Sequence, residues 1–94
     1  MRYNYSTDKR SRARQEILRT FYLELKHQWE SKGVDARMLA MRLNQQVAFV
    51  QNFMDGGTYL TFELLSDVAE ALDCRVTITL RSNRLPENPT QLLP

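Results

Sequence analysis

The sequence predicts a mainly α-helical domain, a bundle of four to five helices that contains a helix-turn-helix and ends in one β-strand. Apolar residues recur every three or four positions through most of the chain, which is the period of amphipathic helices. Within Leu39–Gly56, two short helical periods are separated by a polar stretch that begins Asn44-Gln45-Gln46. This spacing suits two helices of about two turns joined by a tight turn. The period changes to two only at Arg75–Leu80, which predicts the strand.

The size and composition indicate one small folded domain. The chain has 94 residues, of which 43% are hydrophobic, a share typical of globular proteins. No apolar run approaches the roughly 18 residues of a membrane span, and no apolar core of a signal peptide follows the charged amino terminus. We therefore expect a cytoplasmic protein with no membrane partner.

The sequence offers no constellation for catalysis or metal binding. Cys74 is the single cysteine and His27 the single histidine, and neither has acidic residues at the spacing of a metal site or a nucleophilic triad. An internal disulfide is excluded as well, which fits a reducing compartment. We expect no enzyme activity, no catalytic residue, no metal and no cofactor.

Positive charge is concentrated at the amino terminus. The first fourteen residues contain one acidic residue, Asp8, and five basic ones: Arg2, Lys9, Arg10, Arg12 and Arg14. We predict that residues 1–10 form a flexible basic arm suited to phosphate contact or to a reach into a minor groove. The alternative is the solvated, partly frayed start of a helix.

The first helix is predicted from about Arg12 to Ser31. Its apolar stripe consists of Ile17, Leu18, Phe21, Tyr22, Leu25 and Trp29, whose spacing defines one face of a long amphipathic helix. Gly33 supplies a left-handed helix stop. Asp35 is then placed to cap the next helix, Ala36–Leu43.

The next two helices follow from turn and cap residues. Asn44 tolerates the left-handed conformation that a tight turn requires, so the third helix begins near Gln46 and ends at Gly56-Gly57. Thr61 is a plausible cap for a fourth helix. The apolar residues of this helix are Leu64, Leu65, Val68, Ala69 and Leu72, and Asp73 follows its end.

The strand at Arg75–Leu80 lacks a partner within the chain. Val76, Ile78 and Leu80 share one face of it, and its backbone groups need hydrogen-bond partners. The simplest partner is the same strand of a second copy, paired across a two-fold axis; the alternative is a strand donated by another protein. Residues 11–80 thus form the folded domain, and residues 81–94, with three prolines, are expected to be an extended or disordered tail.

The order and spacing of these motifs resemble those of Xre-type helix-turn-helix proteins, over about residues 15–80. The family pattern L-A-x-x-L-G corresponds to Leu39-Ala40-Met41-Arg42-Leu43-Asn44. The pattern I/V-S-x-x-E-x-G corresponds to Val50-Gln51-Asn52-Phe53-Met54-Asp55-Gly56. The helix that ends Ala69-Glu70-Ala71-Leu72-Asp73, followed by a strand, is similar to the end of HipB-type antitoxins. The chain departs from the pattern at Asn44, Gln51 and Met54, where Gly, Ser and Glu are common.

The resemblance implies a DNA-binding transcriptional repressor, which acts as a homodimer on a palindromic operator and regulates its own operon. It also implies residence in bacterial cytoplasm, with the gene on a bacterial or a phage genome. The alternative that it implies is an antitoxin, which binds and neutralises a protein toxin and represses as well. The expected partners are therefore double-stranded DNA, a second copy and, in the alternative, a cognate toxin. RNA binding is a weaker alternative, because the aromatic residues look committed to the core rather than to base stacking.

In this fold the start of the third helix points into the major groove. The residues that would then face bases or phosphates are Gln46, Val47, Ala48, Gln51 and Asn52. Phe49 would either pack on the first helix or lie against a base methyl group. Phosphate contacts are assigned to Arg37, Arg42, Arg10 and Arg12, for which the alternative is a solvated surface. The third helix carries no arginine, so we expect A/T-biased half-sites.

Overall fold

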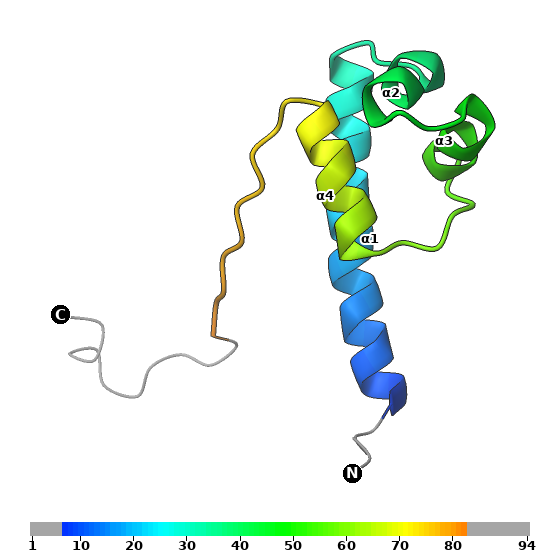
Figure 1. Ribbon diagram of the computed structural model, residues 1–94. Helices are drawn as coiled ribbons and strands as arrows, with labels where there is room; N and C mark the ends of the chain where they lie inside the picture. The colour runs from blue at the N-terminus through cyan, green and yellow to red at the C-terminus, as the bar shows by residue number, and fades with distance from the viewer. Residues whose placement is uncertain (1–6, 83–94) are drawn as a thin grey trace, which may run out of the picture.

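The computed structural model describes residues 7–82, and its secondary structure in this range consists of four helices. These are α1 (Thr7–Ser31), α2 (Ala36–Leu43), α3 (Val47–Met54) and α4 (Phe62–Ala71). In Figure 1, α1 and α4 run side by side in the same direction, and α2 and α3 lie together on one side of them. The prediction of a mainly α-helical bundle is confirmed.

The first helix is longer than its apolar stripe predicts. It begins at Thr7 rather than Arg12, so residues 7–10 are helical and do not belong to a flexible arm. Straight-chain residues such as lysine and arginine have high helix propensity, which allows the helix to extend beyond the part that packs. Residues 1–6 of the predicted arm lie outside the described residues. At 25 residues, α1 is about 37 Å long.

Helix α2 has the predicted bounds, and α3 and α4 begin at or beside the predicted residues, although α3 ends at Met54, before the predicted Gly56-Gly57. Gly33 has φ of +66°, and the Asp35 side chain accepts a hydrogen bond from the Met38 amide at 2.9 Å. Asn44 is left-handed, with φ of 55°. Thr61 caps α4 by accepting a hydrogen bond from the Leu64 amide at 3.1 Å. Each of these residues acts on backbone groups close to it in sequence, which is why the sequence reveals them.

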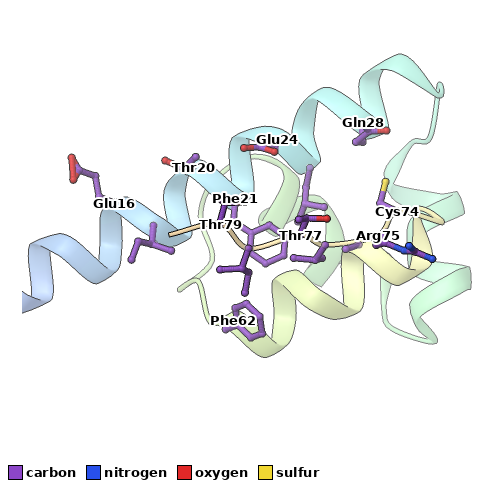
Figure 2. Close-up of a pocket in the computed structure, with 15 residues that line it drawn as sticks. Glu16, Thr20, Phe21, Glu24, Gln28, Phe62, Cys74, Arg75, Thr77 and Thr79 are labelled. Atoms are coloured by element: carbon purple, nitrogen blue, oxygen red, sulfur yellow. The ribbon is translucent and has the colours of Figure 1, made fainter. Parts of the chain in front are cut away.

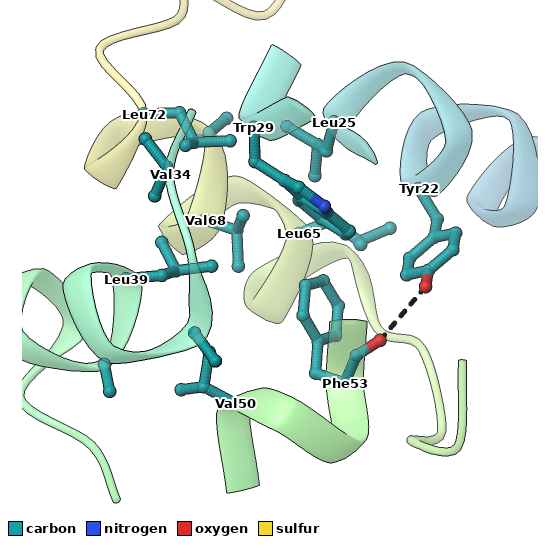
Figure 3. Packing of buried hydrophobic residues seen from close by; sticks show 13 residues of the cluster. Tyr22, Leu25, Trp29, Val34, Leu39, Val50, Phe53, Leu65, Val68 and Leu72 are labelled. Carbon is teal, nitrogen blue, oxygen red and sulfur yellow. Dashed lines mark hydrogen bonds between the residues drawn. The ribbon is translucent and has the colours of Figure 1, made fainter. Parts of the chain in front are cut away.

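The core lies where the four helices meet. Its aromatic part consists of Tyr22, Trp29 and Phe53, whose ring centroids lie between 5.4 and 5.7 Å apart (Figure 3). The other large side chains that are almost completely buried are Leu39, Val50, Leu65, Val68 and Leu72. These aliphatic residues come from α2, α3 and α4 and from the residue after α4, so none of these helices can be removed without opening the core.

The second half of the predicted stripe of α1 is buried, at Tyr22, Leu25 and Trp29. Leu18 and Phe21 are half-buried, and the first residue is exposed. Ile17 is 66% exposed, whereas we expected it in the core. The reason is the length of α4: its first residue, Phe62, contacts Phe21, with ring centroids 5.8 Å apart. Ile17 lies one turn before Phe21 on α1, so it lies beyond the start of α4 and is not covered by that helix.

The hydroxyl group of Tyr22 ties α1 to α3. It lies 3.1 Å from the carbonyl oxygen of Phe53 and 2.9 Å from that of Met54. These are carbonyls of the last turn of α3, which have no partner within the helix. Tyr22 therefore packs its ring into the core and satisfies the end of α3 with the same side chain (Figure 3).

The chain beyond α4 is extended and forms no strand ladder within residues 74–82. Val76, Ile78 and Leu80 are all exposed, Ile78 by 71% and Leu80 by 92%. Pairing with a second copy involves two chains, and the strand at Arg75–Leu80 stays a prediction. Most of the predicted tail, residues 83–94, lies outside the described residues.

Replacing Tyr22 with phenylalanine is expected to lower the free energy of unfolding by about 1 kcal/mol at neutral pH. The Met54 carbonyl then loses its donor, whereas the Phe53 carbonyl keeps the Gly56 amide. Urea denaturation followed by circular dichroism measures this loss. Tyr59→Phe is the matched control, since Tyr59 is 84% exposed. Equal stability of the two variants would contradict a role for the Tyr22 hydroxyl.

The same side chain makes stability depend on pH in the alkaline range. Burial, with a contribution from the negative charge of Asp55, raises the pKa of the Tyr22 phenol above its ordinary value of 10.0. The folded state then holds the phenolic proton more tightly than the unfolded state does. The stabilisation is complete below pH 10.0 and is lost as pH rises through the higher pKa of the folded state. We expect the free energy of unfolding to fall more steeply above this pH in the parent chain than in Tyr22→Phe.

Candidate nucleic-acid interface

Helix α3 has one buried face and one outward face. Val50 and Phe53 are buried in the core. The six side chains predicted to face a nucleic acid are all exposed: Gln46, Val47, Ala48, Phe49, Gln51 and Asn52. Of the two expected positions of Phe49, the outward one fits better, because Phe49 is 39% exposed and is not part of the core cluster.

The turn before α3 is held by backbone hydrogen bonds. The amides of Asn44 and Gln45 donate to carbonyls of α2, at 3.2 Å to Met41 and 3.0 Å to Ala40. Gln46 then precedes α3 in an extended conformation, and its side chain makes no capping hydrogen bond. The first amides of α3 thus have no side-chain acceptor at Gln46, which leaves them available for water or an anionic group.

Two side chains of the outward face are tethered. The Gln51 amide nitrogen donates to an Asp55 carboxylate oxygen at 3.0 Å. The Asn52 amide nitrogen donates to the Thr58 hydroxyl, also at 3.0 Å. Each amide keeps its carbonyl oxygen and one further N–H. These tethers fix the directions in which the two amides point and reduce the rotamer entropy they would lose on binding.

Gly57 leaves room for the Asn52 amide. A Cβ atom at position 57 would overlap with the amide oxygen of Asn52. Sequence reasoning assigned no role to Gly57 or Thr58 beyond the end of the helix. The sequence signal for this contact is Gly56-Gly57 followed by Thr58. The contact between Asn52 and Thr58 could not be predicted from it, because it depends on how the chain turns after Met54.

The predicted cations do not gather around α3. Arg37 is exposed on α2, whereas Arg42 donates to the carbonyl of Ala71 at 3.0 Å and so satisfies the end of α4. Arg12 is exposed on α1, nineteen residues before the end of that helix, which is about 28 Å along its axis. Arg10 lies in the first turns of α1, and its side chain is outside the described part. Among the predicted phosphate contacts without a hydrogen bond to residues 7–82, Arg37 lies nearest to α3 in the chain.

The outward surface of α3 is uncharged, whereas that of α2 combines arginine and methionine side chains. Helix α3 contains no charged residue, and its exposed apolar side chains, Val47 and Phe49, have counterparts on α2 in Met38 and Met41. Such a surface suits contact with the methyl groups of bases or with apolar side chains of a protein.

Other kinds of site find no support in the described range. Within residues 7–82, no three or more His, Cys, Asp and Glu side chains are arranged to hold a metal ion. Over the same residues, no helix has the length and apolar character needed to cross a membrane. Cys74 is free and half-buried, 3.6 Å from the Lys32 ammonium nitrogen.

Comparison with known protein families, curated proteins and solved structures finds no match to this chain. The resemblance to Xre-type proteins therefore stays a prediction, based on the residues quoted for it.

Asn44 tests the turn that positions α3. We expect Asn44→Ala to lower the free energy of unfolding by about 1–2 kcal/mol, because alanine is disfavoured in the left-handed conformation. Asn44→Gly should stay within about 1 kcal/mol of the parent chain. Thermal and urea denaturation measure both, with the exposed neighbour variant Gln45→Ala as control. A glycine variant as unstable as the alanine variant would contradict this explanation.

Proposed function

We propose that this chain is a sequence-specific DNA-binding protein that represses transcription as a homodimer on a palindromic operator, with α3 as its recognition helix. The observation that carries the proposal is the division of α3 into a buried face, Val50 and Phe53, and an exposed face of amide and small apolar side chains. A helix held in this way by its core face presents a rigid surface to a major groove.

The outward side chains suit A·T base pairs. Glutamine and asparagine make bidentate hydrogen bonds to adenine, and small apolar side chains contact the thymine methyl group. Gln51 and Asn52 each retain an acceptor and a donor beyond their tethers, and Val47 and Ala48 are exposed beside them. A selection of binding sequences should therefore be enriched in A·T at the contacted positions.

A palindromic operator requires two copies of α3 at a fixed spacing, about 34–36 Å for adjacent major grooves. Segment 75–80 is the proposed link between the copies. Its apolar side chains Val76, Ile78 and Leu80 are exposed in the single chain. Strand pairing across a two-fold axis would cover them and give the backbone groups their partners.

The exposed methionines favour a second candidate function. Met38 and Met41 lie on α2, beside the turn that leads to Val47 and Phe49. Exposed, adaptable methionine side chains of this kind are typical of a protein-binding site. An antitoxin that binds a protein toxin would use it, and repression of its operon is compatible with that role.

The proposal is tested by a mobility shift with DNA from upstream of the protein's own gene, at two salt concentrations. We expect a shift that depends on a palindrome and weakens as salt rises. No palindrome-dependent shift at low salt would contradict the repressor function. Co-purification with the product of an adjacent gene, disrupted by Met41→Glu, would favour the antitoxin function instead.

Two substitutions separate base contact from phosphate contact. Gln51→Ala should weaken binding to the selected site by about 1–3 kcal/mol and relax its sequence preference. Arg37→Ala should weaken binding to all sequences and reduce the slope of log affinity against log salt by about 1. Gln15→Ala, on an exposed part of α1, is the control that should change neither quantity. Uniform loss from Gln51→Ala would contradict base recognition by α3.

The strand link is tested through Ile78. Ile78→Asp places a charge on the apolar face of the segment, and we expect it to abolish a dimer that light scattering detects for the parent chain. Thr79→Asn, on the opposite face, should leave the dimer intact. A dimer that survives Ile78→Asp would mean that the copies associate through another surface.

A further inference from the structure

A groove runs between α1, the start of α4 and the extended segment after α4. Its volume is about 610 Å³, and Figure 2 shows side chains from all three elements pointing into it. The segment begins beside Lys32, near the end of α1, and runs back toward the start of that helix (Figure 1). Neither α2 nor α3 contributes a residue to this groove.

One row of α1 side chains along the groove is polar and acidic. Glu16, Thr20 and Glu24 follow each other at intervals of four residues and line the groove, so they form a line along the helix. Glu16 and Glu24 are exposed. The row carries two carboxylates and no cation between Glu16 and Glu24, and Arg12 precedes Glu16 by one turn, so this edge of the groove is acidic.

The neighbouring row is apolar and poorly covered. Ile17 and Phe21 lie one position further along α1 than the polar row and also line the groove, together with Phe62 of α4. Ile17 and Phe62 are exposed, and Phe21 is half-buried. The groove therefore presents an apolar strip next to an acidic edge.

Residues 75–81 have the complementary pattern. Val76, Ile78 and Leu80 form one face, and the other face carries arginine at both ends, Arg75 and Arg81. Arg75 and Arg81 are about 20 Å apart along a strand, and Glu16 and Glu24 are about 12 Å apart along the helix. The difference is about 4 Å at each end, which an extended arginine side chain can span. A strand with its apolar face on Ile17 and Phe21 turns its basic face outward, so its arginines reach the exposed glutamates from the rim of the groove.

The chain's own segment does not fill the groove. It forms one wall, with Ile78 71% exposed. If it lay down alone on α1, both edges of its backbone would remain unpaired against apolar side chains, which is costly. A second strand inserted beside it gives hydrogen-bond partners to one backbone edge of each strand. Because each strand has an arginine at both of its ends, antiparallel pairing still places an arginine near each glutamate.

We propose that residues 75–81 of a second copy occupy this groove, with Arg75 and Arg81 of each copy opposite Glu16 and Glu24 of the other. The inference rests on the homodimer of the proposed function and adds its receiving surface on α1. The acidic row sets the register of the exchanged strands, which the apolar contacts alone leave free to shift by two residues.

Charge reversal in the full-length chain tests the proposal. Two double variants are made, Glu16→Arg with Glu24→Arg, and Arg75→Glu with Arg81→Glu. Each creates like-charge contacts at both ends of both strands, and we expect the dimer dissociation constant to rise at least about tenfold at low salt. An equimolar mixture should recover the parent affinity, because in a mixed dimer every groove meets a strand of opposite charge. Analytical ultracentrifugation measures all three samples.

A control carries the same charge change away from the groove. Glu30→Arg with Glu70→Arg alters two exposed residues that do not line it, and this variant should dimerise as the parent chain does. Circular dichroism verifies the helix content of every variant. All four groove substitutions combined in one chain should also restore dimerisation.

The outcomes separate this inference from the function on which it rests. Recovery on mixing supports the exchange between copies. Recovery in the combined variant but not in the mixture would place the contact within one chain and overturn the proposal. A dimer that neither double variant weakens would overturn the groove contact and leave the homodimer standing. A parent chain that is monomeric at all concentrations would overturn both.

Discussion

The position of α3 depends on the contact between Tyr22 and the end of that helix. Helix α3 has eight residues, and isolated helices shorter than about 12 residues are marginal in water. Its stability must come from the burial of Val50 and Phe53 and from the Tyr22 hydroxyl at its last carbonyls. Everything proposed for the outward face of α3 assumes the orientation that these contacts give it.

The two proposed binding surfaces do not compete. The outward face belongs to α3 and the turn before it, whereas the groove is bordered by α1, α4 and the segment after α4. In Figure 1, α2 and α3 lie on one side of the α1–α4 pair and the extended segment leaves on the other. A dimer formed through the groove would therefore leave both copies of α3 accessible, as recognition of a palindrome requires.

Not every basic side chain of the sequence is free to contact a nucleic acid. Lys32 donates to the carbonyl of Leu72, and Arg42 donates to that of Ala71. Both therefore satisfy the end of α4, whose carbonyls have no partner within the helix. Arg37 remains exposed near α3 in the chain, so recognition through α3 would depend more on amide and methyl contacts than on phosphate charge.

The sequence by itself determined the bounds of α2 and the start of α4, because Asp35, Asn44 and Thr61 act on backbone groups within a few residues. The period of Val50 and Phe53 also predicted the buried face of α3, but it left Phe49 open between the core and the outward face, which only tertiary packing decided. Only the tertiary structure decided that Ile17 is exposed, because its burial depends on the point along α1 at which α4 begins to cover that helix. The groove likewise exists only through the parallel packing of α1 and α4, elements about forty residues apart in the chain.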